Sequence, residues 1–210
     1  RSHKVRFSGG ASHDAKVIGY DPHGDISVLK IADGKDLPFC ALGDSDLLRI
    51  GTPGPGKPKV WIMGRQHPSE TMAGFFVEGL LARLLDPSDA LGRALCDALD
   101  IFVVPTVNPD GCAMGNTRLN ARGMNLNRAW DGTDPETAPE VAMIQTRMRA
   151  EGVDFCLDAH GDEELPYVFL GGPLEIPSRS SRLDTLFKDF GQALQRSCPA
   201  YSMDDPYPGG

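Results

Sequence analysis

The sequence predicts an α/β fold, with a mostly parallel or mixed sheet, helices on both of its faces, and a short all-β segment in front. From about residue 58 onward, short apolar runs alternate with amphipathic stretches. Strands that alternate with helices favour a parallel sheet covered on both sides. Before that point, β-type runs are separated only by turn sequences, and no stretch has helical periodicity of useful length.

The change of pattern predicts two regions. In the first, "KVRF", "AKVIGY" and "ISVLKI" are separated by "SGGASHD" and "DPHGD", which are rich in turn-forming residues. We therefore predict a β-strand segment over residues 1–46 and an α/β domain over residues 47–210.

The elements of the second region follow from periodicity. The run "KVWIMG" has the composition of a central strand, and apolar residues at helical spacing follow it. The helix over 135–152 has acidic residues early and arginines late, which matches the helix dipole. Predicted strands lie at 59–64, 100–107, 153–160 and 167–170, and predicted helices at 71–85, within 90–99, at 135–152 and at 181–197.

Charge and cysteine content limit the classes of partner. The net charge is −8 and the pI is about 5.1, which argues against broad binding to nucleic acid or to an anionic membrane. Five scattered cysteines without a CxxC pair favour free thiols in a reducing compartment. No run has membrane-spanning length, and no signal-peptide pattern is present. We expect a cytoplasmic location.

Three potential metal ligands follow two predicted strands. His67 and Glu70 come after the strand at 59–64, and His160 ends the strand at 153–160. In parallel sheets the carboxyl ends of strands meet at one edge, where functional groups collect. An HxxE pair alone is more often structural than metal-binding, but two histidines and a carboxylate form the ligand set of a catalytic Zn²⁺ site.

Basic and amide side chains lie in the loops between these two halves. Arg118, Arg122 and Arg128 stand in a Gly- and Asn-rich passage together with Asn127. Arginine donates two parallel hydrogen bonds to a carboxylate, so Arg118, Asn127 and Arg128 can form an anion clamp. A solvated basic loop is the alternative.

The ordered set "RQHPSET", "VNPDG", "GNTR", "GMNLNRAW" and "DAHGDEELPY" resembles the zinc carboxypeptidase family, and its cytosolic carboxypeptidase branch most closely. The resemblance covers about residues 46–210. It implies that His67, Glu70 and His160 bind Zn²⁺, that Arg118 stabilises the oxyanion, and that Asn127 and Arg128 hold the C-terminal carboxylate of a peptide or protein.

The sequence departs from the family pattern at several positions. Ser69 replaces the glycine of H-P-G-E, and Asn125 stands where many relatives have an aspartate that orients a zinc-binding histidine. No segment matches the family's general-base glutamate or its substrate-closing tyrosine. For Glu163 and Glu164 we expect structural or surface roles. The catalytic set is therefore incomplete, which raises the question of whether this chain is active.

Residues 3–46 resemble a segment of the HtrA/Deg class of trypsin-like serine proteases. Asp25 matches the triad acid, but His3, His13 and His23 match no triad histidine, and no Gly-x-Ser-x-Gly segment occurs. Two partial resemblances suggest a chimera with a crossover near residues 42–51. An incomplete core exposes strand edges, so we expect homo-oligomerisation, strand exchange or marginal stability.

Three functions remain open. The first is a zinc metallocarboxypeptidase, which the "NPDG" and "GNTR" segments favour. The second is a zinc-dependent N-acyl amino acid deacylase of the aspartoacylase type, which uses a similar ligand set. The third is a non-catalytic fragment or chimera with inherited but unused ligands. The glycine-rich "GTPGPG" lacks the Lys-Ser/Thr of a phosphate loop and predicts an ordinary loop.

Overall fold

The chain forms two compact units, Arg1–Asp44 and Ser45–Gly210. The structure is a computed structural model that describes residues 3–6, 12–21, 26–31, 47–132, 134–162, 165, 167–172, 178 and 180–202. The division lies close to the predicted boundary after residue 46. The assignment of a domain type to each unit stays a prediction.

The first unit is a three-stranded antiparallel sheet with the order β1-β2-β3. Its strands are β1 (His3–Arg6), β2 (Ser12–Asp21) and β3 (Ile26–Ile31). The register of β2 against β3 shifts between Val17 and Gly19, where one extra residue forms an irregularity of the β-bulge kind. The prediction of an all-β segment is confirmed. Asp25, His23 and residues 42–46 of the predicted crossover lie outside the described residues.

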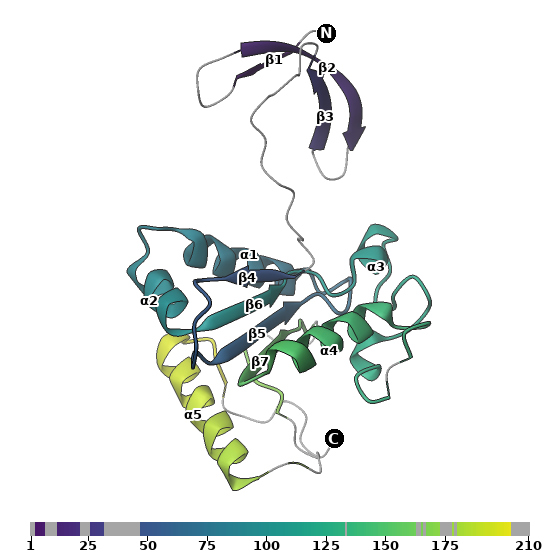
Figure 1. Cartoon of the computed structure of the whole chain (residues 1–210). Coiled ribbons are helices and arrows are strands. Elements are labelled where there is room, and N and C mark those ends of the chain that lie inside the picture. The colour runs from purple at the N-terminus through teal and green to yellow at the C-terminus, as the bar shows by residue number, and fades with distance from the viewer. Residues whose placement is uncertain are drawn as a thin grey trace. The chain divides into compact units, whose positions relative to one another are not determined.

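The second unit is built on a four-stranded mixed sheet with the order β4-β6-β5-β7 (Figure 1). The strands are β4 (Leu48–Ile50), β5 (Lys59–Gly64), β6 (Asp100–Val104) and β7 (Phe155–Ala159). Strand β5 is central and parallel to both β6 and β7, whereas β4 is antiparallel to β6. This sheet, with its helices, confirms the predicted α/β class.

Alternate residues of β5 and β6 build two cores, one on each face of the sheet. Trp61 and Phe102, with stacked rings 4.5 Å apart, pack with Val141 and Ile144 of α4 (Pro139–Glu151). On the other face, Val60 and its neighbours pack against α1 (Thr71–Leu85) and α2 (Ala90–Ala98). Helices on both faces explain why both strands are apolar after their charged first residues, Lys59 and Asp100.

The remaining elements are α3 (Pro109–Ala113), a 3₁₀ turn (Leu126–Arg128) and α5 (Ser181–Ser197). The predicted turn "NPDG" is one turn of helix, because the Asn108 side chain accepts a hydrogen bond from Gly111 N–H at 3.0 Å. The predicted strand at 167–170 is wrong: Val168 forms only an isolated bridge to Tyr201, just after α5. A single pair of residues cannot start a strand ladder.

A buried ion cluster lies where β5 and β6 begin. Asp100 is 1% exposed and accepts hydrogen bonds from Arg49 Nε at 2.8 Å and Nη2 at 2.5 Å. Lys59 Nζ donates to the same carboxylate at 2.7 Å. The hydrogen bonds from Arg49, together with the charge of Lys59, outweigh burial and lower the pKa of Asp100 to about 2.

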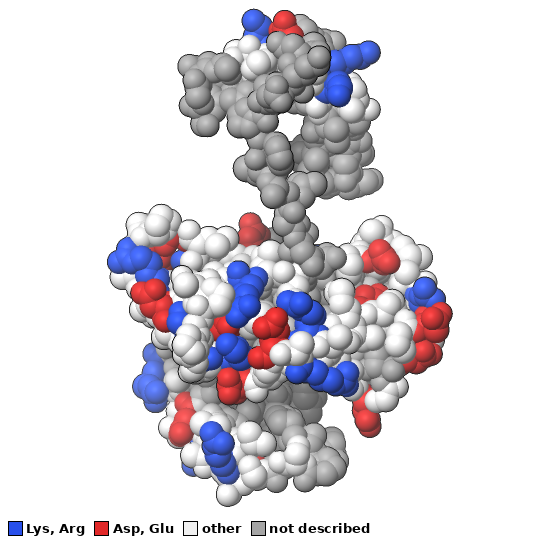
Figure 2. All heavy atoms as spheres, viewed as in Figure 1, with Lys and Arg blue, Asp and Glu red and all other residues white. Residues whose placement is uncertain are grey.

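The surface of the second unit has mixed charge in the view of Figure 2, with acidic and basic side chains next to each other. Such a face has no extended basic field for nucleic acid. In the part of the chain that the structure describes, no helix has the length and apolar character needed to cross a membrane.

Candidate metal centre

The loop after β5 turns the candidate ligands inward. Arg65 has a left-handed backbone with φ of 56°, which is uncommon for a residue other than glycine. The loop is held by a hydrogen bond from Arg65 Nη2 to the Pro68 carbonyl at 2.5 Å and by one from Glu70 N–H to the His67 carbonyl at 3.2 Å. Asn108 Nδ2 donates to the Gln66 carbonyl at 3.0 Å. As a result, both predicted ligands of this loop are buried.

The three predicted ligands converge. His67 Nδ1 lies 2.6 Å from Glu70 Oε1, and His160 Nδ1 lies 2.8 Å from Glu70 Oε2. One potential ligand atom from each of the three residues lies within 4.8 Å of the others. The carboxylate thus stands between two imidazoles that come from opposite ends of the domain sequence, as expected where parallel strands end at one edge.

The outward nitrogen of each imidazole also faces an acceptor. His67 Nε2 lies 3.0 Å from Asn125 Oδ1, and His160 Nε2 lies 2.8 Å from Asp158 Oδ2. The Asn125 oxygen also accepts a hydrogen bond from Asn127 N–H at 3.1 Å, which fixes the orientation of its amide. Asn125 Oδ1 thus offers an acceptor to an Nε2–H of His67, the tautomer that leaves Nδ1 free to bind a metal ion.

This pattern fits a metal ion. A neutral imidazole has one N–H, so when Nε2 donates, Nδ1 presents a lone pair. Here both Nδ1 atoms lie against the same carboxylate, so a cation that takes the place of their protons would meet two nitrogen ligands and one oxygen ligand. Two imidazole nitrogens and a carboxylate are ligands that Zn²⁺ takes in catalytic sites, and outer hydrogen bonds of this kind orient such histidines.

The electrostatics keep the acid ionised. Burial raises the pKa of Glu70, but hydrogen bonds from His160, His67 and Gly161 N–H outweigh burial and leave this pKa below its ordinary value. Burial lowers the pKa of His160, whereas its hydrogen bonds with Asp158 and Glu70 raise this pKa to about 9. A carboxyl group binds a metal ion in its ionised form, and the lowered pKa keeps Glu70 ionised at neutral pH.

Two polar residues that the sequence analysis did not single out support the site. The Gln66 side chain, 1% exposed, donates through Nε2 to Asp158 Oδ2 and accepts from Trp130 Nε1 at 2.9 Å. The spacing D-x-H in a strand was a usable signal for Asp158, because residues two apart in a strand point to the same face. Gln66 gave no such signal, since a glutamine before a histidine is ordinary in a loop.

The predicted clamp residues lie on loops attached to the ligand loop. Thr117, next to Arg118, accepts a hydrogen bond from Ser69 N–H at 3.1 Å. Asn127 joins the site through its backbone bond to Asn125, and Arg128 Nη1 donates to the Asn127 carbonyl at 2.9 Å.

Both guanidinium groups of the clamp are accessible to a ligand. The side chains of Arg118 and Arg128 are exposed, and neither pairs with a carboxylate among the described residues. Arg122 is also exposed. Glu163 and Glu164 lie outside the described residues, so their predicted roles stay predictions.

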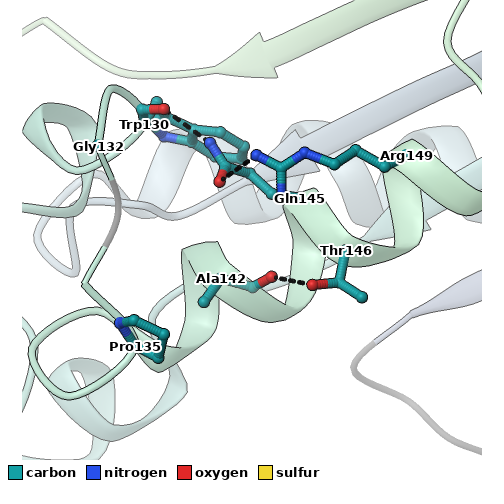
Figure 3. A pocket seen from close by; sticks show the side chains of 7 residues that line it. All are labelled: Trp130, Gly132, Pro135, Ala142, Gln145, Thr146 and Arg149. Carbon is teal, nitrogen blue, oxygen red and sulfur yellow. Dashed lines mark hydrogen bonds between the residues drawn. The ribbon is translucent and has the colours of Figure 1, made fainter.

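A pocket of about 370 Å³ lies between α4 and the preceding loop (Figure 3). None of the predicted site residues lines it. It is connected to the site through Trp130, whose carbonyl accepts a hydrogen bond from Gln145 Nε2 at 2.7 Å. The lining residues are Trp130, Gly132, Pro135, Ala142, Gln145, Thr146 and Arg149.

The chain matches the family described as "Zinc carboxypeptidase" over residues 24–207. It is 40% identical to an uncharacterised protein of Zymomonas mobilis, an alignment that covers 92% of this chain and 50% of the relative. It is 34% identical to cytosolic carboxypeptidase 3 of Mus musculus, covering 67% of this chain and 14% of the mouse protein. The chain thus spans at most about half the length of these relatives.

A solved structure shares the fold. A metallo-carboxypeptidase from Pseudomonas aeruginosa, in complex with (2-guanidinoethylmercapto)succinic acid, is similar with a TM-score of 0.73 and 40% identity. The similarity covers 78% of this chain and 44% of that one. A relationship of residues 3–46 to HtrA/Deg proteases is not shown by these comparisons, and the family match begins within that segment, at residue 24.

Proposed function

Since this chain belongs to the zinc carboxypeptidase family, we propose that it serves in a zinc-dependent metallocarboxypeptidase that hydrolyses C-terminal residues from peptides or proteins. The chain spans about half the length of its relatives, so the activity of the whole protein is part of the proposal.

One observation carries the proposal: both inward Nδ1 atoms meet the two oxygens of a single buried carboxylate, while both outward nitrogens have acceptors of their own. We assign His67, Glu70 and His160 as the ligands of Zn²⁺. When bound, the zinc supplies Lewis-acid chemistry, polarising a carbonyl group and lowering the pKa of a water molecule.

The chain's own residues supply recognition of the substrate. We assign to Arg118 the stabilisation of negative charge on the scissile carbonyl oxygen, an interaction that is strongest in the transition state. To Arg128 and Asn127 we assign binding of the terminal carboxylate, which restricts cleavage to the chain end. The exposed guanidinium groups on loops bonded to the ligand loop support these roles.

The general base is not assigned. No described carboxylate other than Glu70 and Asp158 contacts the two histidines, and both of these are engaged by the histidines themselves. We therefore propose that residues 47–210 contribute the zinc ligands and the clamp for the substrate carboxylate. Without an assigned general base, we expect this chain by itself to hydrolyse peptides slowly.

Two finer assignments belong to the same proposal. We place the protein in the cytosolic carboxypeptidase branch and in the cytoplasm, supported by the name of the mouse relative. We also assign the first β unit to the same family rather than to a serine protease, supported by the family match from residue 24 and by the alignment with the Zymomonas protein over 92% of the chain.

The proposal is tested by binding of peptides to the zinc-loaded chain. A short peptide with a free C-terminal carboxylate is compared with its C-terminal amide and with an N-acyl amino acid. We expect the free carboxylate to bind at least about tenfold more tightly than the amide, because a bidentate arginine–carboxylate pair is lost. Arg128→Ala should remove the preference, while Arg122→Ala should preserve it.

Other results distinguish the alternatives. Preferential binding and turnover of the N-acyl amino acid would favour the deacylase. Absence of zinc binding, with no change on His67→Ala, would favour the non-catalytic fragment. Release of C-terminal residues from the free peptide, measured over hours by mass spectrometry, would extend the proposal from recognition to catalysis.

A further inference from the structure

A continuous chain of hydrogen bonds runs from the pocket of Figure 3 to the candidate metal site. Arg149 Nη2 donates to Gln145 Oε1 at 3.1 Å, and Gln145 Nε2 donates to the Trp130 carbonyl (Figure 3). Trp130 Nε1 donates to Gln66 Oε1, and Gln66 Nε2 donates to Asp158. Asp158 in turn accepts from His160 Nε2.

The middle of this chain has a single possible orientation. The indole N–H of Trp130 can only donate, and the Asp158 carboxylate, when ionised, can only accept. The Gln66 amide lies between them and is 1% exposed, so its oxygen must face Trp130 and its nitrogen must face Asp158. A buried amide with both ends satisfied in this way is rigid, because rotation would unpair both neighbours.

Asp158 depends on this amide. Its Oδ2 accepts from both Gln66 and His160, whereas its buried Oδ1 has no partner among the described residues. Gln66 is therefore the described side chain, besides His160 itself, that holds the Asp158 carboxylate.

We propose that Gln66 is a positioning residue for the metal site. Its amide, held by the Trp130 indole N–H, fixes the Asp158 carboxylate, and Asp158 in turn fixes the ring orientation of His160. This inference rests on the proposed zinc-binding role of His160. Outer hydrogen-bond partners of this kind change metal affinity by about 10–100-fold when they are removed.

The test compares Gln66→Met with Gln145→Met. Methionine has nearly the same length and volume as glutamine but no amide, so it removes both bonds of Gln66. Gln145 is the matched control, because it also bonds to Trp130 but is two steps farther from Asp158. Zinc affinity is measured by competition with a chelator, and the Co²⁺-loaded protein is measured by visible absorption, which reports the ligand geometry.

We expect Gln66→Met to weaken zinc about 10–100-fold and to alter the Co²⁺ spectrum, and Gln145→Met to stay within about twofold of the parent. Equal affinities for the parent and Gln66→Met would overturn the positioning role. So would an equal loss in both variants, since that indicates a general packing effect.

A second variant covers the case in which Gln66→Met does not fold. Gln66→Glu keeps the acceptor for Trp130 but places a second carboxylate against Asp158. We expect it to shift the Co²⁺ spectrum, whereas an unchanged spectrum and affinity would overturn the proposal. If the parent binds zinc no more tightly than His160→Ala, the zinc-binding role itself fails. If the parent binds zinc tightly and Gln66→Met binds it equally tightly, only the positioning role of Gln66 fails.

Discussion

The two ends of strand β5 both bury ionisable groups, but they balance the charge differently. At the start of the strand, one carboxylate, Asp100, meets two permanent cations, Arg49 and Lys59. At its end, the ionisable partners of Glu70 and Asp158 are two imidazoles, and the described residues of that end supply no arginine or lysine to these carboxylates. The first end is thus neutralised by permanent cations, whereas the charge at the second end rests on imidazoles, which can exchange a proton for a metal ion.

This difference separates a structural ion cluster from a metal site. Buried carboxylates are costly unless they are paired, so each end must find positive charge. The cluster at Asp100 finds it within the chain and ties β4 to β5 and β6. The proposed metal site at Glu70 has titratable imidazoles in place of permanent cations, and its loop is held by Arg65 and Asn108.

The largest effect is expected at the proposed metal site, at the end of β5. His67→Ala removes one of the two convergent nitrogens and should weaken zinc binding by at least about 100-fold, because a four-coordinate site loses a protein ligand. His13→Ala, in the first unit, is the control and should leave the affinity unchanged. Zinc titration in the presence of a competing chelator measures both. Equal zinc affinity in the His67→Ala variant and the parent would assign the metal elsewhere.

The next effect breaks the first end. Asp100→Asn leaves Arg49 and Lys59 without their carboxylate and should lower the free energy of unfolding by about 2–3 kcal/mol, less than for a fully buried pair because both cations are partly exposed. The melting temperature should fall by about 5–10 °C. The exposed Asp97→Asn is the control. A loss of zinc affinity in Asp100→Asn would contradict the independence of the two ends.

Acid should weaken the first end in a defined window. The pKa of Asp100 is about 2 when folded and 3.8 ordinarily, so the stabilisation is present above pH 3.8 and is lost as the pH falls toward 2. Its size is roughly 2 kcal/mol. Urea unfolding of the zinc-free parent and of Asp100→Asn between pH 5 and 2.5 measures it. We expect the gap between them to close in this window, and a constant gap would be inconsistent with an ionised Asp100.

The smallest effect is expected from a change that strengthens the hydrogen-bond partner of His67 at the proposed metal site. Asn125→Asp preserves the acceptor for His67 Nε2 and for Asn127 N–H, and it adds negative charge behind a metal-facing ring. We expect zinc to bind about 3–10-fold more tightly. Competition titration decides the sign of the change, and weaker binding would show that the neutral amide is the better partner in this loop.

The sequence predicted the sheet, and it indicated the candidate ligands that the structure brings together, because both leave periodic or motif-like signals. Strand β5 is apolar from Val60 to Met63, as a strand covered on both faces must be, and the HxxE spacing indicated His67 and Glu70. His160 was indicated because it stands at the end of a second predicted strand. The mixed character of the sheet follows from the antiparallel pairing of β4, a three-residue strand too short to have a pattern.

The polar support of the site could not be predicted in the same way. Gln66, Asp158 and Trp130 meet through tertiary contacts across 64 and 92 residues, and no local periodicity records such contacts. Arg49 and Asp100 are likewise 51 residues apart. The predicted strand at 167–170 was wrong for a related reason: whether a segment pairs as a strand depends on a partner distant in the sequence, and here only Val168 pairs, with Tyr201.

The most direct test of the account is anomalous X-ray scattering at the zinc edge from crystals of the zinc-loaded protein. We predict one strong peak among His67 Nδ1, His160 Nδ1 and the Glu70 carboxylate. Asn125 and Asp158 should remain bonded to the Nε2 atoms of His67 and His160, respectively. A zinc-loaded crystal with no peak there, or with its peak at a cysteine, would contradict it.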